Sequence, residues 1–385
     1  MTNQNEDTKI KSTAAENAVG SNFSNQARKK TIVRLLLKTK FIRKNDQGSI
    51  PEPKILICNK KHKQSIKSTC LYVCYNEYME IPLLQSQDWA GLQDSLGEKY
   101  FIKKGSNFRY LAILKDTPLG NYLYLPYGPV SSDVSGFKEA IKSLFNLATE
   151  NNSIFIRIEP QDQRFIKYFP KNTKKTKDLN PKETWVLDLK NELDDKLPQR
   201  LVRYHKNAAK NGIKIIKSND PNDIEKLITL QKNLAKKKGI NTFSEEYLKT
   251  ELAQPFATLY LVEYDNQETG KNEIIAAGLV FDDKTTRYNL QGAQSDKGRR
   301  LHATGILTIQ LIKDAKEIGL KSFDFWGIAP EGAPKNHPWM GFTEFKKTFK
   351  GEQINYAGTY DIVLRPAKYR FYQLIRKINR LRRKV

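Results

Sequence analysis

The sequence contains little cysteine and no long apolar run. These two absences argue against a disulfide-stabilised protein and against a membrane-spanning one. Three of its 385 residues are cysteine, too few for a disulfide scaffold, so we expect a reducing compartment. No uninterrupted stretch of about 18 apolar residues is present, which argues against a membrane-spanning helix. The first 21 residues are polar and lack the apolar core of a secretory signal. The sequence therefore predicts a cytoplasmic protein.

Acidic residues are scarce relative to basic ones, and the imbalance is concentrated at the two ends of the chain. Lys and Arg number 66 against 42 Asp and Glu, a formal net charge of +24. Residues 1–67 carry +10 (15 basic, 5 acidic) and residues 365–385 carry +9 (9 basic, no acidic), which leaves +5 for the middle. Such ends attract polyanions, either nucleic acid phosphates or an anionic lipid surface, although solvated lysine-rich tails have the same composition.

The basic C-terminal segment also carries an apolar pattern typical of an amphipathic helix. Its apolar residues recur at helical spacing, with cations on the other faces: Phe371, Leu374, Ile375, Ile378 and Leu381. A basic amphipathic helix can dock on the protein body, lie on a membrane or contact RNA. We expect it to dock on the body, which is compatible with membrane or RNA contact by its basic face.

Residues 1–80 are predicted to be a basic, largely disordered extension that contains a small Cys/His element at 55–75. All three cysteines and one histidine fall there: Cys58, His62, Cys70 and Cys74. Three cysteines and one histidine form a legitimate zinc set, but the usual two-residue knuckle spacing is missing. Buried free cysteines are the favoured alternative.

The rest of the chain holds two stretches with the same predicted order of elements. Each indicates a hairpin, a loop, a helix and a closing strand. The first comprises residues 110–125, 137–148 and 154–158, and the second comprises 275–290, 307–318 and 321–326. Corresponding positions lie at a near-constant separation, for example Ile113 and Leu279 or Tyr122 and Tyr288. We interpret the repeat as a duplicated α/β domain with mixed sheets.

This order of elements is the centre of the GNAT-like acyltransferase fold, which binds acetyl-CoA. In that fold, backbone N–H groups of a glycine-containing loop before the helix cradle the pyrophosphate. The second unit reads Arg300-Leu301-His302-Ala303-Thr304-Gly305, so that Ala303 replaces the first glycine and crowds the approach. The first unit, around Gly128 and residues 131–136, lacks the motif. A CoA site is therefore disfavoured in both halves.

The densest cluster of unusual residues, several of them aromatic or cationic, lies between positions 326 and 351. Phe345 and Phe349, and likewise Lys346 and Lys350, form one aromatic and one cationic row if the segment is helical. An aromatic side chain can stack on a nucleotide base, and a lysine ammonium can bind a phosphate or stabilise a developing oxyanion. This combination of residues therefore suits a nucleotide ligand. Core phenylalanines beside solvated lysines are the alternative, and the pattern alone favours it.

Five motifs occur in the order found in one enzyme family. They are Gln85-Ser86-x-x-Trp89-Ala90, Leu125-Pro126-Tyr127-Gly128-Pro129-Val130, Thr184-Trp185-Val186-Leu187-Asp188-Leu189, Phe323-Asp324-Phe325-Trp326-Gly327-Ile328 and Gly341-Phe342-x-x-Phe345-Lys346. From about residue 81 to 364 the sequence thus resembles the Fem family, the FemX, FemA, FemB and MurM-like aminoacyltransferases of peptidoglycan bridge synthesis. The resemblance implies tandem GNAT-like domains, the second inserted in the first. It places domain 1 at 81–182 plus 359–385 and domain 2 at 183–358. Residues 220–254 are too few for the long coiled-coil arm of FemA-like members.

The resemblance implies transfer of an amino acid from aminoacyl-tRNA, with no other cofactor, to the stem-peptide amine of a peptidoglycan precursor. That precursor is either lipid II or UDP-MurNAc-pentapeptide. The ester is already activated, so a positioned neutral amine can attack it, and the tetrahedral intermediate needs a cation or N–H donors. By resemblance, Lys346 stabilises the intermediate and the tRNA 3′ end, and Phe345 packs against the terminal adenosine. A register shift of one residue would give the role of Lys346 to Lys347.

The resemblance also implies a precursor site. The candidate substrate-binding residues are Tyr124, Tyr127, Asp133, Tyr247, Tyr288 and Gln93. Ordinary strand and helix aromatics are the alternative for Tyr247 and Tyr288. Gln93 stands where a lysine is expected and Phe243 where an arginine is expected, so two cations are missing. This loss favours a lipid-linked precursor, met at the membrane by the basic ends.

Three functions therefore compete. The leading one is a tRNA-dependent aminoacyltransferase that acts as a monomer in the cytoplasm. Peripheral binding to the inner face of an anionic membrane is compatible with this function and is left open. The others are a CoA-dependent N-acyltransferase and a non-catalytic protein of the same fold that binds RNA or membranes.

Overall fold

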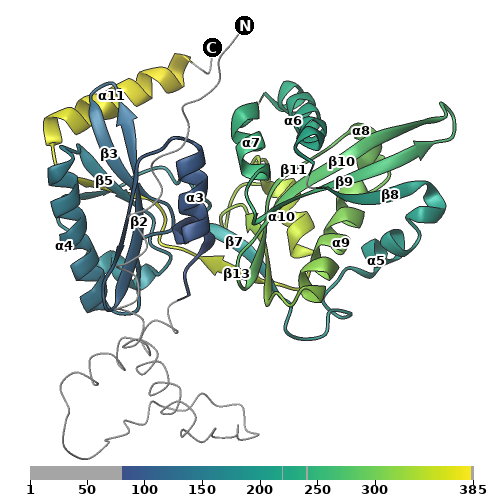
Figure 1. Cartoon of the computed structure of the whole chain (residues 1–385), viewed down its shortest axis with the longest axis horizontal. Coiled ribbons are helices and arrows are strands. Elements are labelled where there is room, and N and C mark those ends of the chain that lie inside the picture. The colour runs from purple at the N-terminus through teal and green to yellow at the C-terminus, as the bar shows by residue number, and fades with distance from the viewer. Residues whose placement is uncertain (1–79, 219, 240–241, 383–385) are drawn as a thin grey trace, which may run out of the picture. The chain divides into compact units, whose positions relative to one another are not determined.

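Two mixed sheets of seven strands each organise the part of the chain that the computed structural model describes (Figure 1). The described residues are 80–218, 220–239 and 242–382. The predicted N-terminal extension, with the zinc candidates Cys58, His62, Cys70 and Cys74, lies outside them. Among the described helices, none combines the length and hydropathy that crossing a bilayer requires.

The first sheet has the strand order β1-β2-β3-β5-β14-β6, and β4 pairs with β2. Its strands are β1 (Tyr100–Lys104), β2 (Phe108–Thr117), β3 (Gly120–Leu125), β4 (Val130–Ser131), β5 (Phe155–Ile158), β6 (Thr173–Lys175) and β14 (Tyr360–Val363). The helices beside it are α3 (Gln87–Ser95), α4 (Val134–Glu150) and α11 (Pro366–Arg382). β3 and β5 run parallel, while the other pairs are antiparallel.

Helices cover both faces of the first sheet because its strands are apolar on both sides. Ile156 packs with the buried stripe of α4, whereas its neighbour Phe155 packs with Tyr369 of α11. Successive strand residues point to opposite faces, so α4 and α11 lie on opposite sides of the sheet. The predicted docking of the C-terminal helix is confirmed, but the apolar row proposed for it does not make the contact, since Phe371 and Leu374 are exposed.

The second sheet has the order β13-β7-β12-β11-β10-β9-β8. Its strands are β7 (Glu183–Asp188), β8 (Ile213–Ser218), β9 (Ala257–Asn266), β10 (Lys271–Asp282), β11 (Thr286–Gln294), β12 (Ser322–Gly327) and β13 (Glu352–Asn355). Its helices are α5 (Gln199–Lys206), α6 (Ile224–Lys238), α7 (Glu245–Leu252), α8 (Asp296–Arg300), α9 (Ala303–Glu317) and α10 (Met340–Lys347). α6 and α7, which occupy the segment considered for an arm, have 15 and 8 residues.

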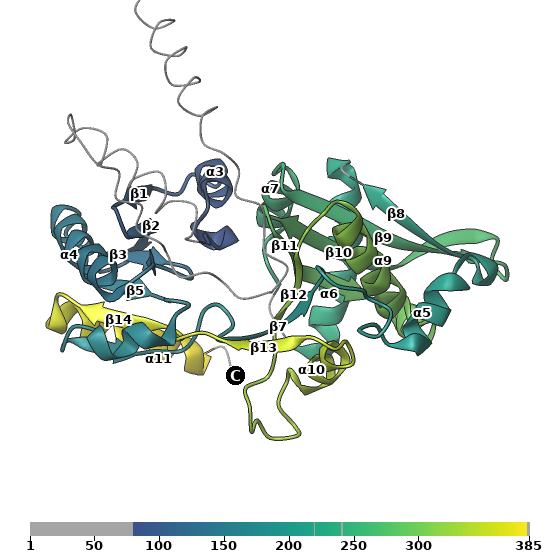
Figure 2. The ribbon, with the colours of Figure 1, turned by 90° about the horizontal axis from the view of Figure 1, so that it is seen from below.

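The two sheets contain the same unit, which confirms the predicted duplication. β2-β3-α4-β5 in the first sheet corresponds to β10-β11-α9-β12 in the second, and each unit closes with a parallel strand pair. The second unit is inserted in the first, because β14 returns after β13 to pair with β5 and β6. Figure 2 shows β13 and β14 following one another from the second sheet back to the first. The exact domain boundaries stay a prediction.

A shared core joins the two sheets. α3 places Trp89 against Phe281 of β10, with ring centroids 6.5 Å apart, in a cluster that also contains Leu248 and Leu252 of α7. Gln85 orders the adjoining loop: its carboxamide bonds to both backbone groups of Leu111 and to the Pro126 carbonyl. The packing of α3 on α7 creates the cavity described next.

Candidate functional site

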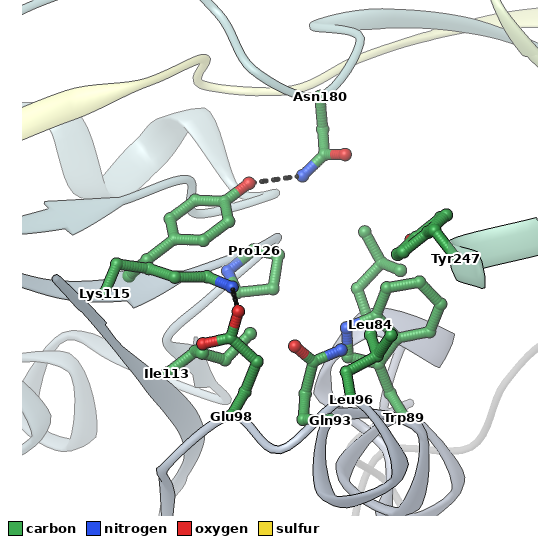
Figure 3. Close-up of a pocket in the computed structure, with 11 residues that line it drawn as sticks. Leu84, Trp89, Gln93, Leu96, Glu98, Ile113, Lys115, Pro126, Asn180 and Tyr247 are labelled. Carbon is green, nitrogen blue, oxygen red and sulfur yellow. Dashed lines mark hydrogen bonds and ion pairs between the residues drawn. The ribbon is translucent and has the colours of Figure 1, made fainter. Parts of the chain in front are cut away.

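A cavity of about 350 Å³, here called cavity A, opens between α3, the β2–β3 hairpin and α7 (Figure 3). It is lined by Leu84, Trp89, Gln93, Leu96, Glu98, Ile113, Lys115, Tyr124, Pro126, Asn180 and Tyr247. Three of the substrate residues predicted from the sequence, far apart along the chain, therefore meet here: Gln93, Tyr124 and Tyr247. Their role in binding stays a prediction.

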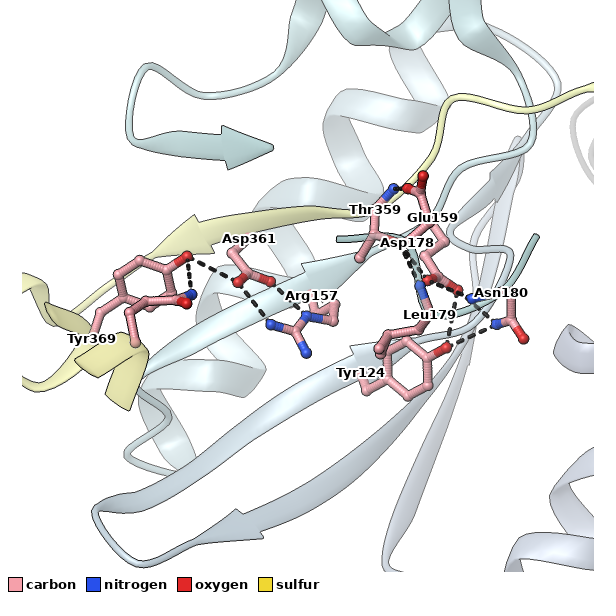
Figure 4. A network of polar contacts seen from close by, with 10 residues as sticks. Tyr124, Arg157, Glu159, Asp178, Leu179, Asn180, Thr359, Asp361 and Tyr369 are labelled. Carbon is pink, nitrogen blue, oxygen red and sulfur yellow. Dashed lines mark hydrogen bonds and ion pairs between the residues drawn. The ribbon is translucent and has the colours of Figure 1, made fainter. Parts of the chain in front are cut away.

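Tyr124 is fixed at the wall of cavity A by a polar network (Figure 4). Its hydroxyl donates to Glu159 Oε2 at 2.9 Å and accepts from Asn180 Nδ2 at 2.8 Å. The Thr359 hydroxyl donates to Glu159 Oε1 at 2.6 Å, so the segment returning from the second sheet orients the same carboxylate. Burial raises the pKa of Tyr124 well above its usual value, which keeps the phenol protonated.

An ion pair that sequence reasoning missed lies in cavity A. Lys115 Nζ is 2.6 Å from Glu98, and the side chains are 29% and 33% exposed. Among the described residues that line cavity A, Lys115 is the one with a positively charged side chain. Gln93, which stands where a lysine is expected, is uncharged. A lysine near the end of a strand carries no local signal of function. Only the approach of α3 and α7 turns its position into part of a cavity.

Tyr247 covers a buried carboxyl group. Glu251, one turn along α7, is 1% exposed, and its Oε2 atom has no hydrogen-bond partner among the described residues. Burial raises the pKa of Glu251 to about 8, against the lowering effect of the neighbouring Tyr247 hydroxyl and Gln291 side chain. The Tyr247 ring also stacks on the Phe243 ring, with the two ring centroids 5.1 Å apart. An aromatic stack thus replaces the cation expected at position 243.

The other two predicted tyrosines pack around Trp326. The Tyr127 and Tyr288 rings lie 5.5 and 6.1 Å from the indole. Their hydroxyls bond within the protein, Tyr127 to the Pro181 carbonyl at 2.9 Å and Tyr288 to Asp283 Oδ2 at 2.8 Å. Both therefore support the indole, and their contact with substrate stays a prediction.

Lys346 is held at the end of β12. Its Nζ donates to the Gly327 carbonyl at 2.7 Å and approaches the Trp326 carbonyl at 3.4 Å. Burial lowers the pKa of Lys346 to about 8, and the nearby Asp324 opposes this shift. Burial also raises the pKa of Asp324 to about 6, although the carboxylate accepts bonds from the Thr184 hydroxyl and, at 2.7 Å, from the Trp326 N–H. The site therefore holds a desolvated ammonium beside a buried acid.

The helix that carries Lys346 also lines a second cavity of about 1100 Å³, here called cavity B. Its lining is largely apolar, with cations from α5 and α8: Pro198, Arg200, Leu201, Leu234, Gln294, Arg299, His302, Thr304, Gly305, Pro338, Trp339, Gly341, Phe342, Phe345 and Thr348. The Lys346 Nζ atom lies 5.0 Å from the ring centroid of Phe342. The predicted pair is thus divided: Phe345 lines cavity B, while Lys346 reaches back to the end of β12.

The start of α9, which faces cavity B, does not fit the pyrophosphate cradle of CoA. Ala303 is fully buried where a glycine would let a ligand approach. A methyl group of Leu201 lies 2.7 Å from the position a Cβ would take on Gly305, so that glycine accommodates α5. The His302 ring stacks on Tyr204 of α5 with centroids 4.5 Å apart.

Asp133 is not among the residues that line cavity A, and its role in binding stays a prediction. It caps α4: its carboxylate accepts from the Gly136 N–H and the Asn107 amide, both at 2.7 Å. It lines a separate cavity beside residues 163–168. The aromatic and cationic rows at spacing four do not form, because α10 ends at Lys347, and the favoured alternative holds for Phe349 and Lys350. Phe349 is fully buried in the core instead, and Lys350 is exposed.

Comparisons with known proteins agree with this fold. Residues 249–377 match the model of the FemAB family. FemX has a similar structure, with a TM-score of 0.65 and 17% identity over 83% of this chain and 100% of FemX. L-PGS from Bacillus licheniformis has a TM-score of 0.52 and 15% identity, over 80% of this chain and 96% of that one. The C-terminal domain of a putative lysylphosphatidylglycerol synthetase from Agrobacterium fabrum has a TM-score of 0.51 with the same identity and shares covered. No curated protein matches the sequence significantly.

Proposed function

We propose that this chain, whose resemblance to the Fem family the FemAB match and the FemX fold confirm, is an aminoacyl-tRNA-dependent aminoacyltransferase. It adds an amino acid to the stem-peptide amine of a peptidoglycan precursor during interpeptide bridge formation. The observation that carries the proposal is the placement of Lys346, a desolvated ammonium at the end of β12, on the helix whose Phe345 lines cavity B. The FemAB match supports the coarser class, a peptidoglycan or lipid aminoacyltransferase.

Cavity B suits the 3′ end of a charged tRNA. The rings of Trp339 and Phe342 are 39% and 41% exposed, which leaves them free to stack on an unpaired base. Arg200 and Arg299 lie exposed at the same cavity, where they can meet backbone phosphates. The combination of apolar rings and rim cations supports a nucleotide-ended ligand.

Cavity A suits the acceptor. Its polar groups, among them Lys115, Glu98 and the Tyr124 hydroxyl, alternate with apolar walls that fit the methylene and methyl groups of a stem peptide. Lys115 would meet a phosphate or a peptide carboxylate of the precursor. Under this proposal, the stem-peptide amine enters from cavity A and the aminoacyl ester from cavity B.

The chemistry needs few protein groups. The neutral acceptor amine attacks the ester carbonyl, the new C–N bond forms, and the ester C–O bond breaks to release the tRNA 3′-hydroxyl. The amine loses a proton, and the leaving oxygen gains one. The Lys346 ammonium would stabilise the negative charge that develops on the carbonyl oxygen, an effect that is strong in a desolvated site.

A CoA-dependent N-acyltransferase is the second candidate, and the fold itself is the observation that favours it. Ala303 and Leu201 at the start of α9 count against it. The third candidate, a non-catalytic RNA- or membrane-binding protein, does not explain why a desolvated lysine lies beside a cavity. We place the enzyme in the cytoplasm as a monomer that meets its precursor at the inner membrane face.

Incubation with charged tRNA pools and purified precursors tests the proposal. Lipid II and UDP-MurNAc-pentapeptide are supplied in separate reactions, with acetyl-CoA in parallel, and products are identified by mass spectrometry. We expect a mass increase of one aminoacyl residue on a precursor, and only with charged tRNA. Acetyl transfer to either precursor without tRNA would instead establish the CoA-dependent alternative.

A further inference from the structure

The C-terminal helix α11 is docked on the first sheet by its tyrosine face. Tyr369 is 5% exposed, and its hydroxyl donates to Asp361 Oδ2 at 2.9 Å (Figure 4). The rings of Tyr369 and Tyr372 lie 5.3 and 5.1 Å from that of Phe155. These contacts hold the helix in one orientation about its axis.

That orientation leaves an apolar stripe in solvent. Phe371, Leu374 and Ile378 are 53%, 50% and 40% exposed. They follow one another at spacings of three and four, so they form a single row. At about 100° per residue, the row lies on the side of the helix roughly opposite Tyr369 and Tyr372.

Cations flank this stripe on both sides. Lys368 lies along one border, and Arg370 and Lys377 lie along the other, all three exposed. No acidic residue occurs from position 365 to 385, where nine Lys and Arg give a charge of +9. Arg376, by contrast, turns toward the body and lies 5.7 Å from the Tyr372 ring centroid.

We propose that α11 is an interfacial anchor whose occupant is an anionic lipid surface. Phe371, Leu374 and Ile378 enter the boundary between headgroups and acyl chains, while the flanking cations meet lipid phosphates. The anchor is pre-formed, because the opposite face of the helix is already packed on the sheet.

Charge selects this occupant over the others. Two copies meeting through this stripe would bring two sets of cations together without an acidic partner, which opposes a symmetric dimer. RNA would satisfy the cations but leave the apolar side chains without a partner. An anionic bilayer satisfies both. The inference deepens the proposed function, since an enzyme held there meets a lipid-linked acceptor, but the binding itself does not depend on that function.

Co-sedimentation of the full chain with vesicles tests the anchor. One set of vesicles contains phosphatidylcholine with phosphatidylglycerol, and the other contains phosphatidylcholine alone. We expect binding to the anionic set that weakens with salt. In the triple variant Phe371→Ser, Leu374→Ser and Ile378→Ser, the partition coefficient should fall at least about tenfold. Thermal unfolding should change little, because these side chains are exposed.

A matched control removes three exposed apolar residues elsewhere. Ile102, Ile166 and Ile318 are 37%, 37% and 56% exposed, and their triple serine variant should bind vesicles like the wild type. Binding unchanged in the α11 variant would overturn the anchor, since the basic N-terminal residues would then account for it. If the α11 variant kept vesicle binding but lost a dimer or lost RNA binding, the stripe would have a different occupant. That result would also overturn the anchor.

The anchor and the proposed function can fail separately. With an active enzyme, the α11 variant should lose transfer to lipid II in vesicles yet keep transfer to soluble UDP-MurNAc-pentapeptide. An enzyme inactive on every precursor but bound to vesicles through α11 would reject the function and keep the anchor. If an α11 variant that no longer co-sediments with vesicles still transferred fully to lipid II in those vesicles, the anchor would not contribute to the reaction.

Discussion

The indole of Trp326 and the phenol ring of Tyr127 lie 5.5 Å apart, and the two residues have positive φ angles of 64° and 50°. Such conformations cost on the order of 1–3 kcal/mol each in residues other than glycine, and they persist where the surroundings enforce them. At position 326 the turn directs the end of β12 toward Lys346, whose ammonium binds the carbonyl groups of Trp326 and Gly327. The aromatic contact thus braces the turn that positions the lysine.

Replacing Lys346 by alanine should abolish most transfer. Removing one donor to a developing oxyanion lowers kcat by about 10²–10³-fold in comparable sites, whereas tRNA affinity should be largely kept because the rings and arginines of cavity B remain. Single-turnover transfer and filter binding of charged tRNA measure the two effects. Lys347→Ala is the matched control, since Lys347 is exposed and its ammonium lies over the Trp185 ring. Equal activity in the Lys346→Ala variant would falsify the assigned role.

The pH dependence of transfer should reflect the lowered pKa of Lys346. Burial brings this pKa to about 8, so the fraction of ammonium falls about tenfold per pH unit above that value. A neutral acceptor amine becomes more abundant in the same range, so the rate should pass through a maximum. Lys346→Arg should be slower yet lack the alkaline decline, because a guanidinium stays charged. An identical alkaline limb in that variant would assign the decline to another group.

Lys115→Ala should weaken precursor binding. Loss of the cation that lines cavity A should raise KM for the precursor about tenfold, or about 1.4 kcal/mol. The value of kcat should change little, because the proposed role of Lys115 is to bind a phosphate or carboxylate of the precursor and not the reacting amine. Steady-state kinetics separate the two constants. Lys103→Ala, on an exposed position of β1, serves as the control. A fall in kcat with KM unchanged would contradict a binding role.

Apolar periodicity predicts the fold well because it reflects local packing. The buried row Phe137, Ile141 and Leu144 identifies α4, and the near-constant offset between the strands of the two units identifies the duplication. The different environments of Phe345, which lines cavity B, and Lys346, which binds the end of β12, do not follow from helical spacing in the sequence. The rows at spacing four do not form, because α10 ends before Phe349. Phe349 lies in the core just beyond the end of this helix.

The missed residues depend on contacts between distant segments. Lys115 and Glu98 look like solvated residues until α3 and α7 close cavity A around them. Asp133 carries a usable signal, since an aspartate immediately before an apolar helix is an N-cap pattern, and this competes with a substrate role. The sequence shows the apolar stripe of α11 but not its exposure, because periodicity alone does not say which face of a helix docks.

The buried Glu251 should make stability depend on pH. Its pKa is raised to about 8 in the folded chain, whereas an unfolded glutamate titrates near 4.3. The folded state therefore holds a proton that the unfolded state releases, and stability is lost as pH rises through this window. Glu251→Gln should gain stability relative to the wild type between pH 5 and 9, by on the order of a few kcal/mol. Urea unfolding at both pH values measures this, with the exposed Glu246→Gln as control. A constant difference across the range would contradict a raised pKa.

Asp361→Ala should destabilise the first sheet far more than loss of a surface pair. Asp361 and Arg157 are 0% and 2% exposed and form a bidentate contact at 2.7 and 2.8 Å between β14 and β5. Removing the carboxylate leaves a buried guanidinium and the Tyr369 hydroxyl without their acceptor, which should cost about 3–5 kcal/mol. Asp162→Ala is the control: it breaks a pair with Arg164, which is 76% exposed, so water replaces the lost contact. Because β14 is the strand that returns after the inserted domain, urea unfolding of the two variants also tests the insertion. Equal stability losses would mean that β14 is not an integral strand of the first sheet.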